Sequence, residues 1–182
     1  FFPRESKRPG AWMTAFREES IDADGKATRP HVTIVMNFTK PTPTKPSLLT
    51  PYEVSTFLHE FGHALHGLMA STVYSSLSGT NVYRDFVELP SQFNENYLKQ
   101  KEFLDGFARH YQTGASIPAE LVNKIVETSQ FGAGYACLRQ LSFGMTDMAW
   151  HTTTEPVKDP AKFETEAMAH VNMFPVVDGC LF

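Results

Sequence analysis

The first forty residues contain two apolar stretches that are typical of β-strands. Residues 10–16 form an apolar and aromatic run that ends before the polar turn Asp22-Ala23-Asp24-Gly25, and this pattern favours a strand. Residues 31–38 are rich in β-branched side chains and end at Thr39-Lys40-Pro41, so they predict a second strand. Prolines at positions 41, 43 and 46 then predict an extended connection, because each fixes φ and disfavours helix in the residue before it.

The pattern after this connection predicts a helix over residues 51–70. Thr50, Pro51 and Glu53 occupy the cap, first and third positions of a capping box. Apolar residues then follow at the three- and four-residue spacing of one helical face: Val54, Phe57, Leu58, Phe61, Leu65 and Leu68. Such a stripe packs one side of a helix against a core, so we expect this helix to be an integral part of the fold.

The remainder of the chain is predicted to be mainly helical. Residues 75–83 lack periodicity and favour a loop, and a helix is predicted from residue 85, with Pro90 in its first turns or at a kink. Further helices are predicted over residues 100–112, 118–127, 133–151 and 160–173. The predicted fold class is therefore mainly α with a small β-sheet, and a length of 182 residues favours one domain.

Composition excludes two classes of partner and favours one compartment. The formal net charge is −4, which argues against nucleic acid, and no stretch approaches the roughly 20 apolar residues of a membrane span. Cys137 and Cys180 have no CxxC spacing, so we expect two buried thiols. Few cysteines and no signal peptide favour the cytoplasm, and an opening without methionine favours a fragment of a longer chain.

The predicted helix over residues 51–70 carries candidate metal chemistry. It contains His59-Glu60-Phe61-Gly62-His63, an HExxH motif, and residues four apart on a helix point the same way. Zinc binds nitrogen and oxygen ligands at about 2.0–2.2 Å, and a catalytic site leaves one position for water. Glu60 is rotated from His59 by roughly 100°, so we expect it to take a proton from that water rather than bind the metal.

The spacing leaves the third protein ligand open among four carboxylates: Asp85, Glu88, Glu95 and Glu102. The first three fall close to one helical face, so one can bind metal while another orients a histidine. His66 shares the histidine face, and we expect it to pack or to support a ligand. The alternative, in which HExxH is only a solvated polar face, is disfavoured by the cap, the apolar stripe and Gly62, which allows a neighbour to approach closely.

Four blocks of sequence, in order, carry a resemblance to a known family. They are residues 2–13 (FPRESKRPGAWM), 37–41 (NFTKP), 59–66 (HEFGHALH) and 78–92 (SGTN through DFVELPSQ). A weaker similarity continues through residues 109–115 and 147–151. In these blocks the chain resembles the thimet oligopeptidase family of zinc peptidases, in particular its bacterial peptidyl-dipeptidase Dcp branch.

The resemblance implies a zincin-like catalytic core built around the HExxH helix, with one Zn²⁺ per chain. It implies that Glu88 is the third zinc ligand and that Glu60 is the general base. It also implies an enzyme that releases C-terminal dipeptides from oligopeptide substrates, with residues 31–38 as the strand that pairs with substrate backbone. An endo-acting oligopeptidase is the alternative, because groups elsewhere in such an enzyme decide where the peptide is cut.

The chain also departs from this family. Family members are several hundred residues long, so residues 1–182 are expected to form a partial catalytic domain without the N-terminal helical and C-terminal substrate-binding portions. The family's substrate-binding histidine and Gly-Gly-Tyr loop are expected beyond residue 182, and Tyr135 matches an earlier helix and has no expected catalytic role. Losing an oxyanion donor costs on the order of 10²–10³ in turnover. The isolated chain is thus expected to be a nearly inactive zinc-binding scaffold, and a helical interaction module with a coincidental HExxH is a further alternative.

Overall fold

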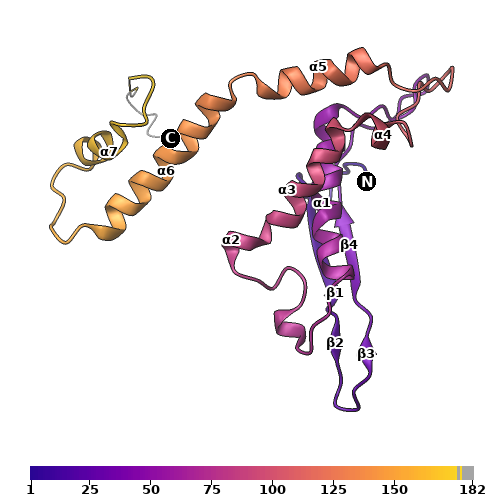
Figure 1. Cartoon of the computed structure of the whole chain (residues 1–182), viewed down its shortest axis with the longest axis horizontal. Coiled ribbons are helices and arrows are strands. Elements are labelled where there is room, and N and C mark those ends of the chain that lie inside the picture. Colours follow the sequence, from indigo (N-terminus) through magenta and orange to yellow (C-terminus); the bar gives the residue numbers. More distant parts are fainter. Residues whose placement is uncertain (176, 178–182) are drawn as a thin grey trace. The chain divides into compact units, whose positions relative to one another are not determined.

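The computed structural model describes residues 1–175 and 177, and it is mainly helical with a small antiparallel β part (Figure 1). The predicted fold class is confirmed at this level. The chain divides into two compact units, Phe1–Ile125 and Val126–Phe182. That residues 1–182 form part of one catalytic domain stays a prediction, and Cys180 lies outside the described residues.

Strand β1 (Trp12–Arg17) pairs antiparallel with β4 (His31–Val35), and both were predicted. Strands β2 (Ser20–Ile21) and β3 (Ala27–Thr28) form a second two-stranded sheet that continues the same ribbon (Figure 1). Their turn is closed by Asp22, whose carboxylate accepts hydrogen bonds from two backbone N–H groups of the turn. The pattern predicted only this turn, because two-residue strands are too short to show alternation.

Helix α1 (Pro51–Leu68) begins at the predicted capping box. The Thr50 hydroxyl accepts from the Glu53 N–H at 3.2 Å, and a Glu53 oxygen accepts from the Thr50 N–H at 2.8 Å. The other Glu53 oxygen accepts from the N–H and hydroxyl of Thr39 at 2.6 and 2.8 Å. The backbone hydrogen bonds from Thr50 and Thr39 are the main reason that the pKa of Glu53 falls to about 2.

The helix predicted from residue 85 is two short helices that meet at Glu88. A 3₁₀ turn, η1 (Ser75–Leu77), lies in the predicted loop, and α2 (Arg84–Val87), α3 (Leu89–Glu95) and the 3₁₀ turn η2 (Asn96–Lys99) follow. Pro90 has no N–H to bond the carbonyl four residues earlier, so it is accommodated in the first turn of a new helix. The prediction of one continuous helix was therefore wrong, although its placement of Pro90 in a first turn was right.

The later helices are α4 (Lys101–Leu104), α5 (Ala119–Gln130), α6 (Ala133–Thr152) and α7 (Pro160–Met168). The helix predicted over residues 100–112 was too long. A turn closes instead, in which the His110 N–H donates to the Ala115 carbonyl and Gly114 adopts a left-handed φ of 72°. Cys137 on α6 is exposed, so the expected buried thiol was wrong there. Within the described part of the chain, no helix combines the length and apolar character needed to cross a bilayer.

Helix α1 packs against α3, β1 and β4, and among the described elements its contact with α3 is the most extensive. A β-carbon at Gly62 would lie 2.6 Å from the α-carbon of Ser91 and 2.7 Å from the carbonyl oxygen of Pro90. Asn94 is buried in the same interface, where its amide donates to the Leu58 carbonyl at 2.6 Å. Gly62 thus permits the close approach that its place in the motif predicted.

Replacing Gly62 with alanine is expected to destabilise the fold by about 1–3 kcal/mol, because the added methyl group overlaps backbone atoms that no rotamer change can move. Denaturant titration of both proteins would measure this. Gly144→Ala on α6 is the matched control, since a β-carbon there meets nothing within 4 Å and alanine is the better helix former. Equal stability of the Gly62→Ala and wild-type chains would contradict the close packing.

Candidate metal centre

Three side chains from α1 and the α2–α3 junction converge on one point. His59 Nε2 lies 3.2 Å from Glu88 Oε2, and His63 Nε2 lies 3.1 Å from the same oxygen. A ligand atom from each of the three residues lies within 4.8 Å of the others. The histidines are one helical turn apart on α1, and Glu88 is the residue at which α2 ends and α3 begins.

These residues fit a zinc ion. Ligand atoms at about 2.0–2.1 Å around a tetrahedral ion are separated from one another by about 3.3–3.4 Å. The observed 3.1 and 3.2 Å between the carboxylate oxygen and each imidazole nitrogen are close to this spacing. Two imidazoles and one carboxylate are also a donor set that zinc uses when it keeps an open position.

Ser91 holds the carboxylate of Glu88. Its hydroxyl is fully buried and lies 2.7 Å from Glu88 Oε2 and 3.0 Å from the Glu88 carbonyl oxygen. This hydrogen bond is the main cause that lowers the pKa of Glu88; burial opposes it, and His63 and His59 lower the pKa further. Sequence reasoning missed Ser91, and its one signal was its position three residues after Glu88 in the first turn of a helix.

The two histidines differ at their second ring nitrogen. His59 Nδ1 lies 2.7 Å from Oε1 of Glu95, which is the last residue of α3. The other Glu95 oxygen accepts from the Ser55 hydroxyl at 3.5 Å. His63 Nδ1 is buried and has no hydrogen-bond partner among the residues that the structure describes. The His59 imidazole therefore has a carboxylate at each ring nitrogen, whereas the His63 imidazole has one only at Nε2, from Glu88.

Glu60 is a buried carboxylate beside this group. Only 7% of the residue is exposed, and burial is the largest cause that raises its pKa; His59 and His63 partly lower it, while Glu88 raises it further. Glu60 borders a hollow of about 330 Å³. The hollow is lined by Ala11, Tyr52, Ser55, Thr56, His59, Glu60 and Glu95. A basic carboxylate in this place can exchange a proton with a molecule bound in the hollow.

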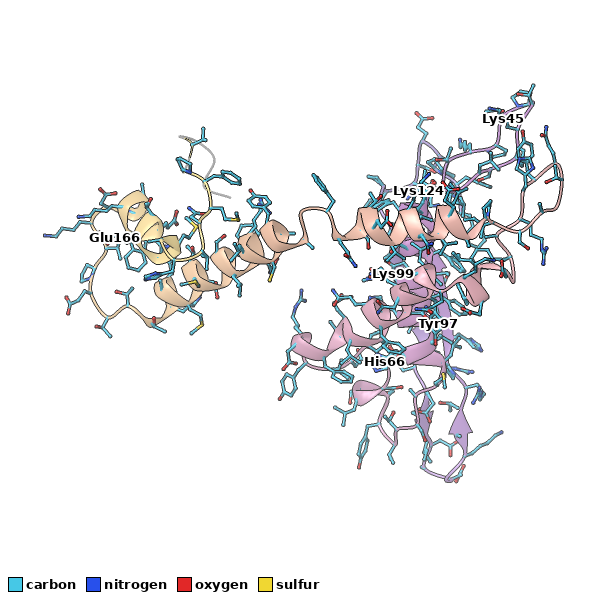
Figure 2. All side chains as sticks on the ribbon, turned by 45° about the horizontal axis from the view of Figure 1, so that its top comes forward. Lys45, His66, Tyr97, Lys99, Lys124 and Glu166 are labelled. Atoms are coloured by element: carbon cyan, nitrogen blue, oxygen red, sulfur yellow. The ribbon has the colours of Figure 1, made fainter. Side chains whose placement is uncertain are left out.

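The other sequence candidates lie outside the group. Asp85 and Glu102 are exposed on α2 and α4. His66 lies further along α1 (Figure 2), its ring packs edge-on to Phe86, and its Nδ1 is buried without a partner in the described part of the chain. Burial, followed by the charge of His63, lowers the pKa of His66. Tyr135 lies on α6 and packs against Phe174, in the second unit.

Residues 1–178 match the model of peptidase family M3. The chain is 44% identical over 175 residues to dipeptidyl carboxypeptidase from Escherichia coli (strain K12), covering 95% of this chain and 25% of that protein. It is 39% identical over 167 residues to oligopeptidase A of the same strain, with 91% and 25% covered. It is 39% identical over 168 residues to a thimet-like oligopeptidase of Dictyostelium discoideum, with 91% and 24% covered. The chain thus spans about a quarter of the length of these relatives.

Proposed function

Because the chain belongs to peptidase family M3, we propose that it carries the metal-binding part of a zinc peptidase active site, within a zincin-like core. In this proposal His59, His63 and Glu88 hold one Zn²⁺ ion. The observation that supports it best is that both histidine Nε2 atoms lie within 3.2 Å of one Glu88 oxygen.

Other residues near the proposed zinc ligands have proposed roles in proton transfer and in holding a ligand in place. When bound, a zinc ion supplies Lewis acidity that polarises a peptide carbonyl and makes water more acidic. Glu60 is the proposed general base, which takes a proton as water attacks the carbonyl. Ser91 donates its hydroxyl hydrogen to the carboxylate of Glu88 and lowers its pKa, which favours the charged form. The burial of Glu60 raises the pKa of its carboxylate, which makes it a better proton acceptor.

The proposed substrates are oligopeptides, from which C-terminal dipeptides are released. The 44% identity to a dipeptidyl carboxypeptidase supports this reaction. An endo-acting oligopeptidase is the second candidate, and the 39% identity to oligopeptidase A supports it.

An extended substrate is proposed to pair with an edge of the β1–β4 sheet. Residues 31–38, which include β4, were the expected strand. In the described residues this sheet has two strands, so each has one edge without a strand partner. Ala11, directly before β1, lines the same hollow as His59 and Glu60, which makes β1 a second candidate.

Polypeptide outside these 182 residues is the proposed partner that completes the site. Large aromatic side chains are exposed in the described part of the chain, including Phe131 at 91%, Tyr83 at 89% and Phe16 at 81%. The chain covers about a quarter of the length of the curated relatives it matches, which supports contacts with polypeptide beyond these residues. Residues 1–182 alone are therefore proposed to bind zinc but to hydrolyse peptides slowly. The cytoplasmic location and the exclusion of nucleic acid stay predictions from composition.

The purified chain is expected to bind about one zinc ion, and His59→Ala and His63→Ala are each expected to lose it, because two remaining ligands hold zinc poorly. Elemental analysis after dialysis against a weak chelator measures the content. His151→Ala, at an exposed position on α6, is the control that keeps its zinc. Zinc retained at the wild-type level in both ligand variants would rule out this site and favour an interaction module.

Glu60→Gln preserves the shape of the side chain but removes its ability to accept a proton. We expect turnover of the full-length protein to fall by about 10²–10⁴-fold while zinc is retained. Hydrolysis of an internally quenched peptide, with zinc analysis in parallel, measures both. Glu102→Gln, which makes the same charge change at an exposed position on α4, should leave both unchanged. Normal turnover in the Glu60→Gln protein would remove the proposed base.

The cleavage position is decided by mass spectrometry of the products from two versions of one oligopeptide. If the enzyme releases C-terminal dipeptides, the peptide with a free carboxylate is shortened by two residues at a time, and the version with an amidated C-terminus resists cleavage. Internal cleavage of both versions at the same bond would instead identify the endo-acting alternative.

A further inference from the structure

We propose that Glu95 is a positioning residue for the metal centre, which holds the His59 imidazole in the tautomer and orientation that present Nε2 to the metal. This inference rests on the proposed zinc site and goes beyond it, since Glu95 itself is not a ligand. The contact on which it rests is that of His59 Nδ1 with the Glu95 carboxylate.

The two nitrogens of the His59 ring face two different carboxylates. Nδ1 lies 2.7 Å from Glu95 Oε1, and Nε2 lies 3.2 Å from Glu88 Oε2. A neutral imidazole has one N–H and one nitrogen lone pair, and an ionised carboxylate can only accept. A metal held by Nε2 would use the lone pair of that nitrogen, on the side where His63 and Glu88 converge. The single ring hydrogen would then be on Nδ1, where Glu95 Oε1, 2.7 Å away, can accept it.

The packing of α3 on α1 places both carboxylates at the same imidazole. Glu88 directly precedes α3 and Glu95 ends it, so they are seven residues, or about two helical turns, apart and lie on one face. Ser91 and Asn94 are buried on the same helix, and the Asn94 amide donates to the carbonyl of Leu58, the residue before His59. This side-chain to backbone bond fixes α3 next to the peptide that carries His59.

Glu95 also has a second contact on α1. Its other oxygen accepts from the hydroxyl of Ser55, one turn before His59, at 3.5 Å. His63 has no equivalent of this arrangement, since its Nδ1 is buried without a hydrogen-bond partner in the described residues. The His63 side chain is 12% exposed, whereas that of His59 is 26% exposed. His59, the more exposed of the two histidines, is therefore the one whose Nδ1 contacts a second carboxylate, that of Glu95.

If Glu95 had only a structural role, its replacement would change the stability of the chain but not its affinity for zinc. The Glu95 side chain is 37% exposed, and an ion pair or hydrogen bond this open to water contributes little to stability, so loss of a structural contact alone would leave zinc affinity unchanged. Partners that orient a metal-binding histidine commonly affect metal affinity by about 10–100-fold. Metal affinity and the stability of the metal-free chain therefore separate the two roles.

The first experiment measures the zinc dissociation constant of the Glu95→Gln chain by competition with a coloured chelator. We expect affinity to fall about 10-fold or more, because the amide is a weaker acceptor for the Nδ1–H, while thermal unfolding of the metal-free chain stays near that of the wild type. Glu102→Gln removes the same charge from an exposed position and should not change affinity. Wild-type zinc affinity in the Glu95→Gln chain would overturn the proposal.

The second experiment asks whether Glu95 acts through His59. Zinc dissociation constants of His59→Ala, Glu95→Ala and the double variant are measured by direct titration up to millimolar zinc, which covers the weak binding expected once a ligand is lost. The absorption bands of bound Co²⁺ report the ligand geometry of each single variant. If Glu95 acts through His59, the double variant binds no more weakly than His59→Ala; losses that multiply would contradict this. If His59→Ala binds zinc as tightly as the wild type, the proposed zinc site fails. If only Glu95→Ala and Glu95→Gln are without effect, the zinc site stands and the positioning role fails.

Discussion

The backbone of α3 lies against Gly62 of α1, at a separation that leaves no room for a β-carbon. His59 and His63 lie within one turn of Gly62, so this contact decides how closely Glu88, at the start of α3, comes to both imidazoles. Ser91 uses the same proximity: its α-carbon faces Gly62, and its hydroxyl donates to Glu88. The spacing of the candidate ligands is therefore set by contact between two backbones, which is more rigid than contact between side chains.

The sequence predicts α1 well because the information for this helix is local. A capping box and an apolar stripe define its start and its buried face, and HExxH places two imidazoles on one side of it. The third member of the group is not local. Spacing left four carboxylates open, and only the break at Glu88 and the packing of α3 on Gly62 bring that one to the histidines. The resemblance implied Glu88, and the structure places it in the group, while metal binding itself stays a prediction.

Elements that depend on distant contacts or on very few residues were the ones missed. The aromatic residues after Gln100 have helical spacing, but α4 ends at Leu104, and residues 108–117 form a turn closed by backbone hydrogen bonds with Gly114 in a left-handed conformation. The β2–β3 hairpin is too short for a periodic pattern, and it depends on the Asp22 turn instead. Contacts such as that of Glu95 with His59 join residues 36 positions apart, so no local pattern identifies which carboxylate serves which histidine.

Glu53 ties together the two ends of the proline-containing segment between the sheet and α1. One of its oxygens binds Thr39, at the start of the segment, and the other binds Thr50, at its end. Lys45 lies at the outer end of this segment (Figure 2) and is exposed. The segment is thus a loop closed at its base, and doubling the length of such a loop costs only about 0.6 kcal/mol in closure entropy. We expect a fluorophore or an affinity tag on the exposed Lys45 side chain to leave the register of the histidine helix against the sheet unchanged.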